Sequence, residues 1–160
     1  MPNISINLLT RGRKHVLSKE DVKEINDLLL ELSTNTKPVS EDFILSVADK
    51  GILFIARETT KKQRGKIVGI ASLVLCHKLS GLSAWVEDVV VSPQYQGQGI
   101  GKLLMRALLE YDWSKDTNTK GAVPSRIELT SRPSRVAANK LYQSLGFEKY
   151  ETNVYRKKVL

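Results

Sequence analysis

The chain has 160 residues, of which 41% are hydrophobic and 26% are charged, with 25 basic against 17 acidic side chains. These proportions are typical of a globular protein and exclude a collagen-like, coiled-coil or disordered chain. The length favours a single domain over residues 1–160. No apolar run approaches the roughly 20 residues that span a bilayer, and the N-terminus lacks the apolar segment of a secretory signal.

Cysteine and histidine are scarce. One cysteine, Cys76, and two histidines, His15 and His77, exclude an intramolecular disulfide and most metal sites. We therefore expect no metal, and the same scarcity suggests a cytoplasmic location. The net charge of +8 favours an anionic partner such as a phosphate, a nucleotide or an acidic surface. Basic residues are densest in three short segments that also suit solvated loops or tails, at 11–14, 61–66 and 156–158.

The first half of the chain alternates between strand and helix patterns. In chain order, these patterns predict a strand at 3–9, helices at 19–33 and 41–49, and strands at 52–58, 66–77 and 84–91. Ser18 precedes Asp21 by three residues, which predicts a capping box at the start of the first helix. Short turns join the last three strands, so we expect an antiparallel meander.

The second half predicts a crossover. In chain order, the patterns indicate a helix at 99–112, a polar loop at 114–125, a strand at 126–131, a helix at 135–145, and two short strands within 147–159. Ser134 is the expected cap of the last helix, and Gly146 its C-terminal glycine. The strand–helix–strand unit predicts a right-handed parallel connection. The fold class is therefore α/β (α+β), with a mixed sheet of six to seven strands flanked by about four helices.

A glycine-rich segment joins the strand at 84–91 to the helix at 99–112. It runs Gln96, Gly97, Gln98, Gly99, Ile100, Gly101, Lys102. Alternating glycines let a backbone turn tightly and approach a ligand, and N–H groups at a helix N-terminus bind phosphate or pyrophosphate. The segment is neither a Walker A loop, since Leu103 follows Lys102, nor a G-x-G-x-x-G fingerprint. A glycine-rich turn without a ligand is the alternative.

Two motifs in order resemble those of the GNAT superfamily of N-acetyltransferases. The first is Val89-Val90-Val91 followed by Gln96-x-x-Gly99-x-Gly101, and the second is Ala138-x-x-x-Tyr142-x-x-x-Gly146-Phe147. Many members of the superfamily carry an asparagine seven residues before the helix tyrosine. Here that position is Arg135, and Asn139 lies on the same helical face. The predicted element order agrees with the GNAT fold along essentially the whole chain.

The resemblance implies acetyl-CoA as co-substrate. Its pyrophosphate would lie on the N–H groups of the segment 97–102, and its pantetheine arm along 89–91. The residues implied to contact it are Val89, Val90, Val91, Gln96, Gly97, Gln98, Gly99, Ile100, Gly101, Lys102 and Asn139. The charge of +8 suits a donor whose three phosphates carry roughly −4.

Transfer to an amine needs a base, an oxyanion donor and an acid. By the resemblance, a backbone N–H near Val89 serves the oxyanion and Tyr142 protonates the thiolate. Glu87 is our candidate base, with Asp88 or a purely structural carboxylate as alternatives. Unbroken strand alternation would place Glu87 with Val89, and Asp88 on the opposite face. A buried Tyr142 in the apolar stripe of its helix is the alternative to an acid, and we expect Cys76 to be buried rather than to carry an acyl group.

The acceptor amine is left open by the motifs. The stretch 87–99 is locally similar to the glucosamine 6-phosphate N-acetyltransferase branch, while aminoglycosides, polyamines, amino-acid derivatives and protein amines are further acceptors. The alternative function is a non-catalytic acyl-CoA-binding or regulatory domain. We expect no membrane partner, and no nucleic-acid partner because RNP-like, zinc and helix-turn-helix motifs are lacking. A homodimer is compatible with the resemblance.

Overall fold

The computed structural model describes residues 3–10, 17–59 and 65–159. These residues belong to two compact units, Met1–Thr130 and Ser131–Leu160. The first unit holds, in chain order, β1 (Ile4–Leu9), α1 (Lys19–Leu32), α2 (Glu41–Lys50), β2 (Gly51–Glu58), β3 (Ile67–Lys78), β4 (Gly81–Val91), the 3₁₀ turn η1 (Pro93–Tyr95), α3 (Ile100–Leu109), the 3₁₀ turn η2 (Trp113–Lys115) and β5 (Ile127–Glu128). The second unit holds α4 (Val136–Ser144).

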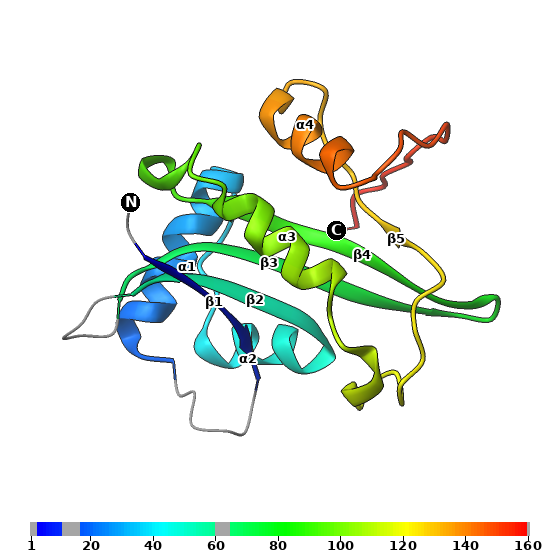
Figure 1. Ribbon diagram of the computed structural model, residues 1–160, viewed down its shortest axis with the longest axis horizontal. Coiled ribbons are helices and arrows are strands. Elements are labelled where there is room, and N and C mark those ends of the chain that lie inside the picture. Colours follow the sequence, from blue (N-terminus) through cyan, green and yellow to red (C-terminus); the bar gives the residue numbers. More distant parts are fainter. Residues whose placement is uncertain (1–2, 11–16, 60–64, 160) are drawn as a thin grey trace. The chain divides into compact units, whose positions relative to one another are not determined.

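The sheet has the strand order β1-β2-β3-β4-β5. The first three pairings are antiparallel, and β5 joins β4 in parallel. The meander is therefore confirmed, as is the parallel crossover through α3. In Figure 1, α3 crosses one face of the sheet while α1 and α2 lie behind the opposite face.

Apolar side chains fill both sides of the sheet. On the α1 and α2 side, the core includes Ile25, Leu28, Ile44, Ile55 and Val90. On the other side, α3 buries three side chains completely, Leu104, Met105 and Leu108. Gly69 of β3 lets α3 approach, since a Cβ there would meet Leu104 Cδ1 and the Val90 carbonyl oxygen, both at 3.1 Å.

The start of α1 confirms the predicted capping box. Ser18 Oγ accepts from the Asp21 N–H at 3.1 Å, and Asp21 Oδ2 accepts from the Ser18 N–H at 2.8 Å. Each bond satisfies a backbone donor left free at the helix start. The same carboxylate pairs through Oδ1 with Arg57 Nη2 of β2 at 2.7 Å, so the cap also fastens α1 to the sheet.

Some element bounds differ from the sequence-based expectation. β4 begins at Gly81 because the hairpin turn is closed by the pair Lys78 and Gly81. α3 ends at Leu109, since Tyr111 leaves the helix to bond Asp116 and to pack edge-on against Trp113.

The expectations for the second unit need two corrections. Arg135, not Ser134, is the N-cap of α4, and it makes no side-chain capping bond. The two strands expected within 147–159 are absent from these described residues, so the described sheet has five strands. An isolated short hairpin is only marginally stable in water. Within its own unit, the described part of this segment has α4 beside it but no further strand to pair with.

Candidate functional site

The glycine segment adopts the tight turn that its sequence predicts. Gly97 and Gly99 have φ values of +75° and +80°, in the left-handed region that favours glycine. A Cβ at either position would meet no atom within 4 Å. The two glycines therefore serve the turn itself, and both face open space that a ligand can fill.

The first turn of α3 presents backbone donors to that space. Gly99 is the N-cap, and no side chain caps the helix. The first N–H groups of an α-helix have no partner within the helix, and they attract anions together with the helix dipole. The N–H groups from Gly99 to Lys102 are thus available for a phosphate or pyrophosphate group.

Two glutamine side chains of the segment hold its own backbone. Gln96 Nε2 donates to the Val91 carbonyl at 2.9 Å, and Gln98 Nε2 donates to the Gln94 carbonyl at 3.3 Å. The strand end is tied to the sheet because the Ser92 N–H donates to the Val68 carbonyl at 2.8 Å. These glutamines thus contribute to the shape of the loop.

A β-bulge interrupts β4 directly before the valine run. Ile70 pairs with Val90, but Ser72 pairs with Glu87, so two residues of β4 oppose one of β3. Within the bulge, Asp88 has a φ of +51°. Asp and Asn tolerate this left-handed conformation better than other residues with a Cβ, and such strain often marks a functional segment.

The bulge overturns the expected alternation of side chains. Residues opposite one another in a sheet share a face, so Glu87 and Val90 lie on the face of Ser72 and Ile70. Ile70 and Val90 belong to the core beneath α1 and α2. Glu87 is therefore directed to the α1 and α2 side, together with Val90 rather than with Val89. The apolar pattern of β4 does not reveal the bulge. The aspartate within the strand, Asp88, is the sequence feature that could have indicated it.

The outer edge of β4 has little strand pairing next to the glycine segment. β5 pairs with β4 only at Ala84 and Trp85. Along 86–91, β4 has no strand partner on this side among the described residues. An exposed strand edge can accept an extended ligand as an added strand.

The two carboxylates at the bulge are exposed, yet protein atoms surround them in part. This partial burial raises the pKa of Glu87, and the neighbouring charge of Asp88 raises it further. Burial also raises the pKa of Asp88. Both shifts favour proton uptake, which suits a general base.

The predicted residues of the second unit lie on α4. Tyr142 is buried and packs edge-on against Phe147, with ring centroids 6.1 Å apart. Burial raises the pKa of Tyr142 while the Arg135 charge opposes the rise, so the hydroxyl is protonated at neutral pH. Asn139 Nδ2 donates to the Arg132 carbonyl at 2.9 Å, which occupies part of its amide.

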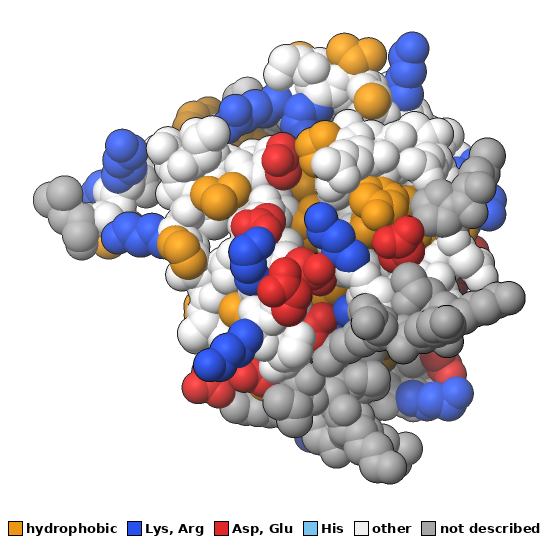
Figure 2. Space-filling model, turned by 90° about the vertical axis from the view of Figure 1, so that its left-hand side faces the viewer, with side chains coloured by type: hydrophobic (Ala, Val, Ile, Leu, Met, Phe, Trp, Pro, Cys, Tyr) orange, Lys and Arg blue, Asp and Glu red, His pale blue; other side chains and the backbone are white. Residues whose placement is uncertain are grey.

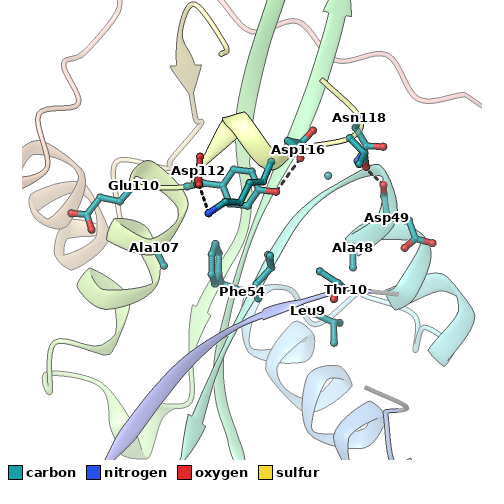
Figure 3. A pocket seen from close by; sticks show the side chains of 15 residues that line it. Leu9, Thr10, Ala48, Asp49, Phe54, Ala107, Glu110, Asp112, Asp116 and Asn118 are labelled. Carbon is teal, nitrogen blue, oxygen red and sulfur yellow. Dashed lines mark hydrogen bonds and ion pairs between the residues drawn. The ribbon is translucent and has the colours of Figure 1, made fainter. Parts of the chain in front are cut away.

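A cavity of about 510 Å³ lies at the other end of α3. Its apolar lining includes Leu9, Phe54 and Ala107 (Figure 3). Ala107 is eight residues beyond Gly99, which corresponds to about 12 Å along the helix. At the cavity, Tyr111 donates to Asp116 at 3.1 Å. The cavity is thus separate from the glycine segment.

The surface bears both charges. On the face drawn in Figure 2, basic and acidic side chains are interspersed rather than separated into one basic patch. Of the three basic segments, all of 11–14 and most of 61–66 lie outside the described residues, as does His15. Cys76 is only partly buried, contrary to expectation. Within 3–10, 17–59 and 65–159, we find no cluster of acidic, histidine or cysteine side chains suited to a metal ion, and no helix long and apolar enough to cross a bilayer.

Known proteins resemble this chain in sequence and fold. It is 30% identical over 141 residues to the glucosamine 6-phosphate N-acetyltransferase of Trypanosoma brucei brucei, which spans 85% of this chain and 88% of that protein. It is also 30% identical over 121 residues to an aminoglycoside N(6')-acetyltransferase of Stenotrophomonas maltophilia, covering 72% of each. A crystal structure of a Trypanosoma brucei acetyltransferase superposes with a TM-score of 0.67 at 26% identity, over 98% of this chain and 100% of that one.

A solved aminoglycoside N-acetyltransferase, AAC(6')-Iy in complex with CoA, shares the fold with a TM-score of 0.69 at 19% identity, over 99% of this chain and 96% of that one. The family model described as "Acetyltransferase (GNAT) domain" matches residues 49–149. This match contains the β4 bulge, the glycine segment and Tyr142. The resemblance drawn from the two motifs is confirmed: the chain belongs to the GNAT family of acetyltransferases.

Proposed function

We propose that the protein transfers the acetyl group of acetyl-CoA to a primary amine by direct attack in a ternary complex. One observation carries the proposal. Beyond Trp85, β4 has no strand on its outer side among the described residues, and the glycine segment leads from the end of β4 to the N-terminus of α3, which no side chain caps. A ligand with an extended, hydrogen-bonding arm and a pyrophosphate fits this sequence of features.

The donor is proposed to bind in two parts. The N–H groups of the segment 97–102 hold the pyrophosphate, where a side chain on Gly97 or Gly99 would otherwise intrude. The pantetheine arm lies along Val89, Val90 and Val91. The chain's net charge of +8 favours a donor whose phosphates carry roughly −4.

The proposed chemistry forms a C–N bond and breaks the thioester C–S bond. Glu87, with Asp88 as the alternative, accepts the proton that the attacking amine loses. A backbone N–H near Val89 stabilises the oxyanion. Tyr142 donates a proton to the departing CoA thiolate and regains one from solvent.

For the acceptor we propose an amino sugar. The support is the identity to two relatives whose names specify glucosamine 6-phosphate and aminoglycosides. Glu87 and Asp88 also suit a cationic acceptor, because two carboxylates attract an ammonium group. A cytoplasmic location, a homodimer and a single domain over residues 1–160 remain predictions.

The first test is the melting temperature with acetyl-CoA, with ATP and NAD as controls. A ligand at about 100 times its Kd adds about 2.7 kcal/mol of stability. A rise confined to acetyl-CoA supports the proposal, whereas no rise at millimolar acetyl-CoA contradicts it. Thiol release is then followed with glucosamine 6-phosphate, an aminoglycoside, spermidine and a lysine peptide. Turnover restricted to spermidine or the peptide would contradict the amino-sugar acceptor.

A further inference from the structure

Tyr95 links the glycine segment to a distant part of the sheet. It is the last residue of η1 and directly precedes Gln96. Its half-buried side chain reaches the far end of β2, where Tyr95 Oη donates to Glu58 Oε2 at 3.2 Å. The two residues are 37 positions apart in the chain.

The backbone of Glu58 is held at the end of the sheet. Its N–H donates to the Lys66 carbonyl at 2.9 Å, which closes the end of the β2–β3 pair. Its neighbour Arg57 pairs with Asp21 of α1 at 2.7 Å and donates to the Gly65 carbonyl at 2.6 Å. The strand end that receives the Tyr95 hydroxyl is therefore held by α1 and by β3.

The other side-chain bonds of the segment are local. Those of Gln96 and Gln98 reach back five and four residues. Among the residues the structure describes, Tyr95 to Glu58 is the side-chain hydrogen bond that ties the stretch 92–102 to a strand distant in the sequence, while the backbone N–H of Ser92 ties the start of the stretch to Val68 of β3. Local bonds define the shape of a loop, but a bond to the sheet fixes where the loop stands.

We infer that Tyr95 is a positioning residue for the pyrophosphate of the donor, acting through its hydroxyl and Glu58 to place the N–H groups of 97–102. The inference rests on the proposed function. A loop that is already held in its binding conformation loses less conformational entropy when the ligand binds. Preorganisation of the loop therefore increases the affinity for the ligand. Tyr95 itself need not touch the donor.

The surroundings keep the hydroxyl a donor. Burial raises the pKa of Tyr95, and the bond to Glu58 and the charges of Glu58 and Glu24 raise it further. The phenol therefore stays protonated at and well above neutral pH, where the carboxylate of Glu58 accepts its hydrogen bond.

The test compares two ligands on the Tyr95→Phe variant, which removes only the hydroxyl. CoA carries the pyrophosphate, whereas pantetheine lacks it. We expect the Kd for CoA, measured by calorimetry, to rise about five- to tenfold, equivalent to about 1–1.4 kcal/mol. The Kd for pantetheine, from an NMR titration, should stay at the wild-type value, and kcat at saturating substrates should be unchanged.

Matched variants separate positioning from folding. Tyr111→Phe also removes a hydroxyl bonded to a carboxylate, Asp116, at the other end of α3, and should leave the Kd for CoA unchanged. Glu58→Ala should raise the Kd for CoA as much as Tyr95→Phe does. The double variant should have the same Kd for CoA as either single variant. Glu58→Gln keeps an acceptor oxygen and should retain most of the affinity.

The outcomes are distinct. Wild-type affinity for CoA in both Tyr95→Phe and Glu58→Ala overturns the inference. Equal weakening of CoA and pantetheine also overturns it, since the residue then acts on the whole fold. If the wild-type protein itself fails to bind CoA, the proposed function fails, and this inference fails with it.

Discussion

Ser72 Oγ donates a hydrogen bond to the backbone carbonyl of Glu87 at 3.1 Å, across the β3–β4 pair where the bulge begins. Ser72 is 2% exposed, so this bond is shielded from water. It satisfies a buried hydroxyl, which would otherwise cost free energy, and it fixes the backbone of the proposed base. The bulge therefore combines a rigid backbone with two exposed carboxylates, Glu87 and Asp88.

Replacing the proposed base should lower the catalytic rate and leave the affinity for acetyl-CoA unchanged. We expect Glu87→Gln to lower kcat about 100-fold or more, the usual scale for losing a general base, with the Kd for CoA unchanged. Steady-state kinetics with the identified acceptor check this. If Asp88→Asn loses the rate while Glu87→Gln keeps it, the two carboxylates exchange roles.

The pH profile tests the same assignment. Partial burial and the Asp88 charge raise the pKa of Glu87 above its ordinary value of 4.5. A base is active when deprotonated, so kcat/KM should fall as the pH drops through this raised pKa. Asp88→Asn removes a neighbouring negative charge and should move the acid limb to lower pH. An acid limb that does not move contradicts coupling between the two carboxylates.

Two glycines with positive φ allow backbone strain to be separated from ligand binding. Gly99 has φ +80° at the start of α3, and Gly81 has φ +120° in the β3–β4 hairpin. Alanine at either position meets open space but a disfavoured backbone, which costs about 1–2 kcal/mol at Gly99 and about 1–3 kcal/mol at Gly81. Both variants should have a lower melting temperature, whereas only Gly99→Ala should bind CoA more weakly. Equal CoA affinity in both would contradict the phosphate site at the helix start.

Tyr142→Phe removes the proposed acid and keeps the ring that packs against Phe147. We expect kcat to fall about 100-fold or more, as for loss of a general acid, with little change in melting temperature. Tyr150→Phe is the control, because that side chain lies in the same unit and is 84% exposed. If the two variants have equal kcat, Tyr142 is a packing residue and not the acid.

Elements with a strong periodic pattern were predictable, because local preference and burial agreed in them. The amphipathic α1 and α3 and the strands of the meander follow the expected ranges within a few residues. The conformation of the segment 147–159 was not predictable in this way. Its Val and Tyr residues favour strands, but strand pairing depends on a neighbouring strand that the local sequence does not specify.

The site was predictable in part. The glycine segment carries its own signal, since positive φ values favour glycine. The bulge at Asp88 was missed because strand alternation was extended through Glu87 to Val91, and tertiary pairing with β3 breaks it. The link from Tyr95 to Glu58 joins residues far apart in the chain, and no local pattern encodes it.

The buried ion pair between Asp21 and Arg57 should govern stability at acid pH. Its side chains are 2% and 12% exposed, and the Oδ1–Nη2 distance is 2.7 Å. We expect Asp21→Asn to lower the free energy of unfolding at neutral pH by about 2–3 kcal/mol, because Arg57 loses its buried partner. The asparagine side chain of this variant would still offer an oxygen to the helix cap, so the loss reports mainly the charge.

The pH dependence of that loss has a defined sign. Burial works to raise the pKa of Asp21, but hydrogen bonds from Ser18 and Arg57 outweigh it and hold the pKa below 3.8. A lowered carboxyl pKa stabilises the fold above the unfolded value and loses this effect as the pH falls through the folded value. The wild-type advantage over Asp21→Asn in urea unfolding should therefore shrink below about pH 4. Asp27→Asn, which breaks an exposed pair with Lys23, should change stability little at any pH; equal losses in the two variants would contradict a stabilising buried pair.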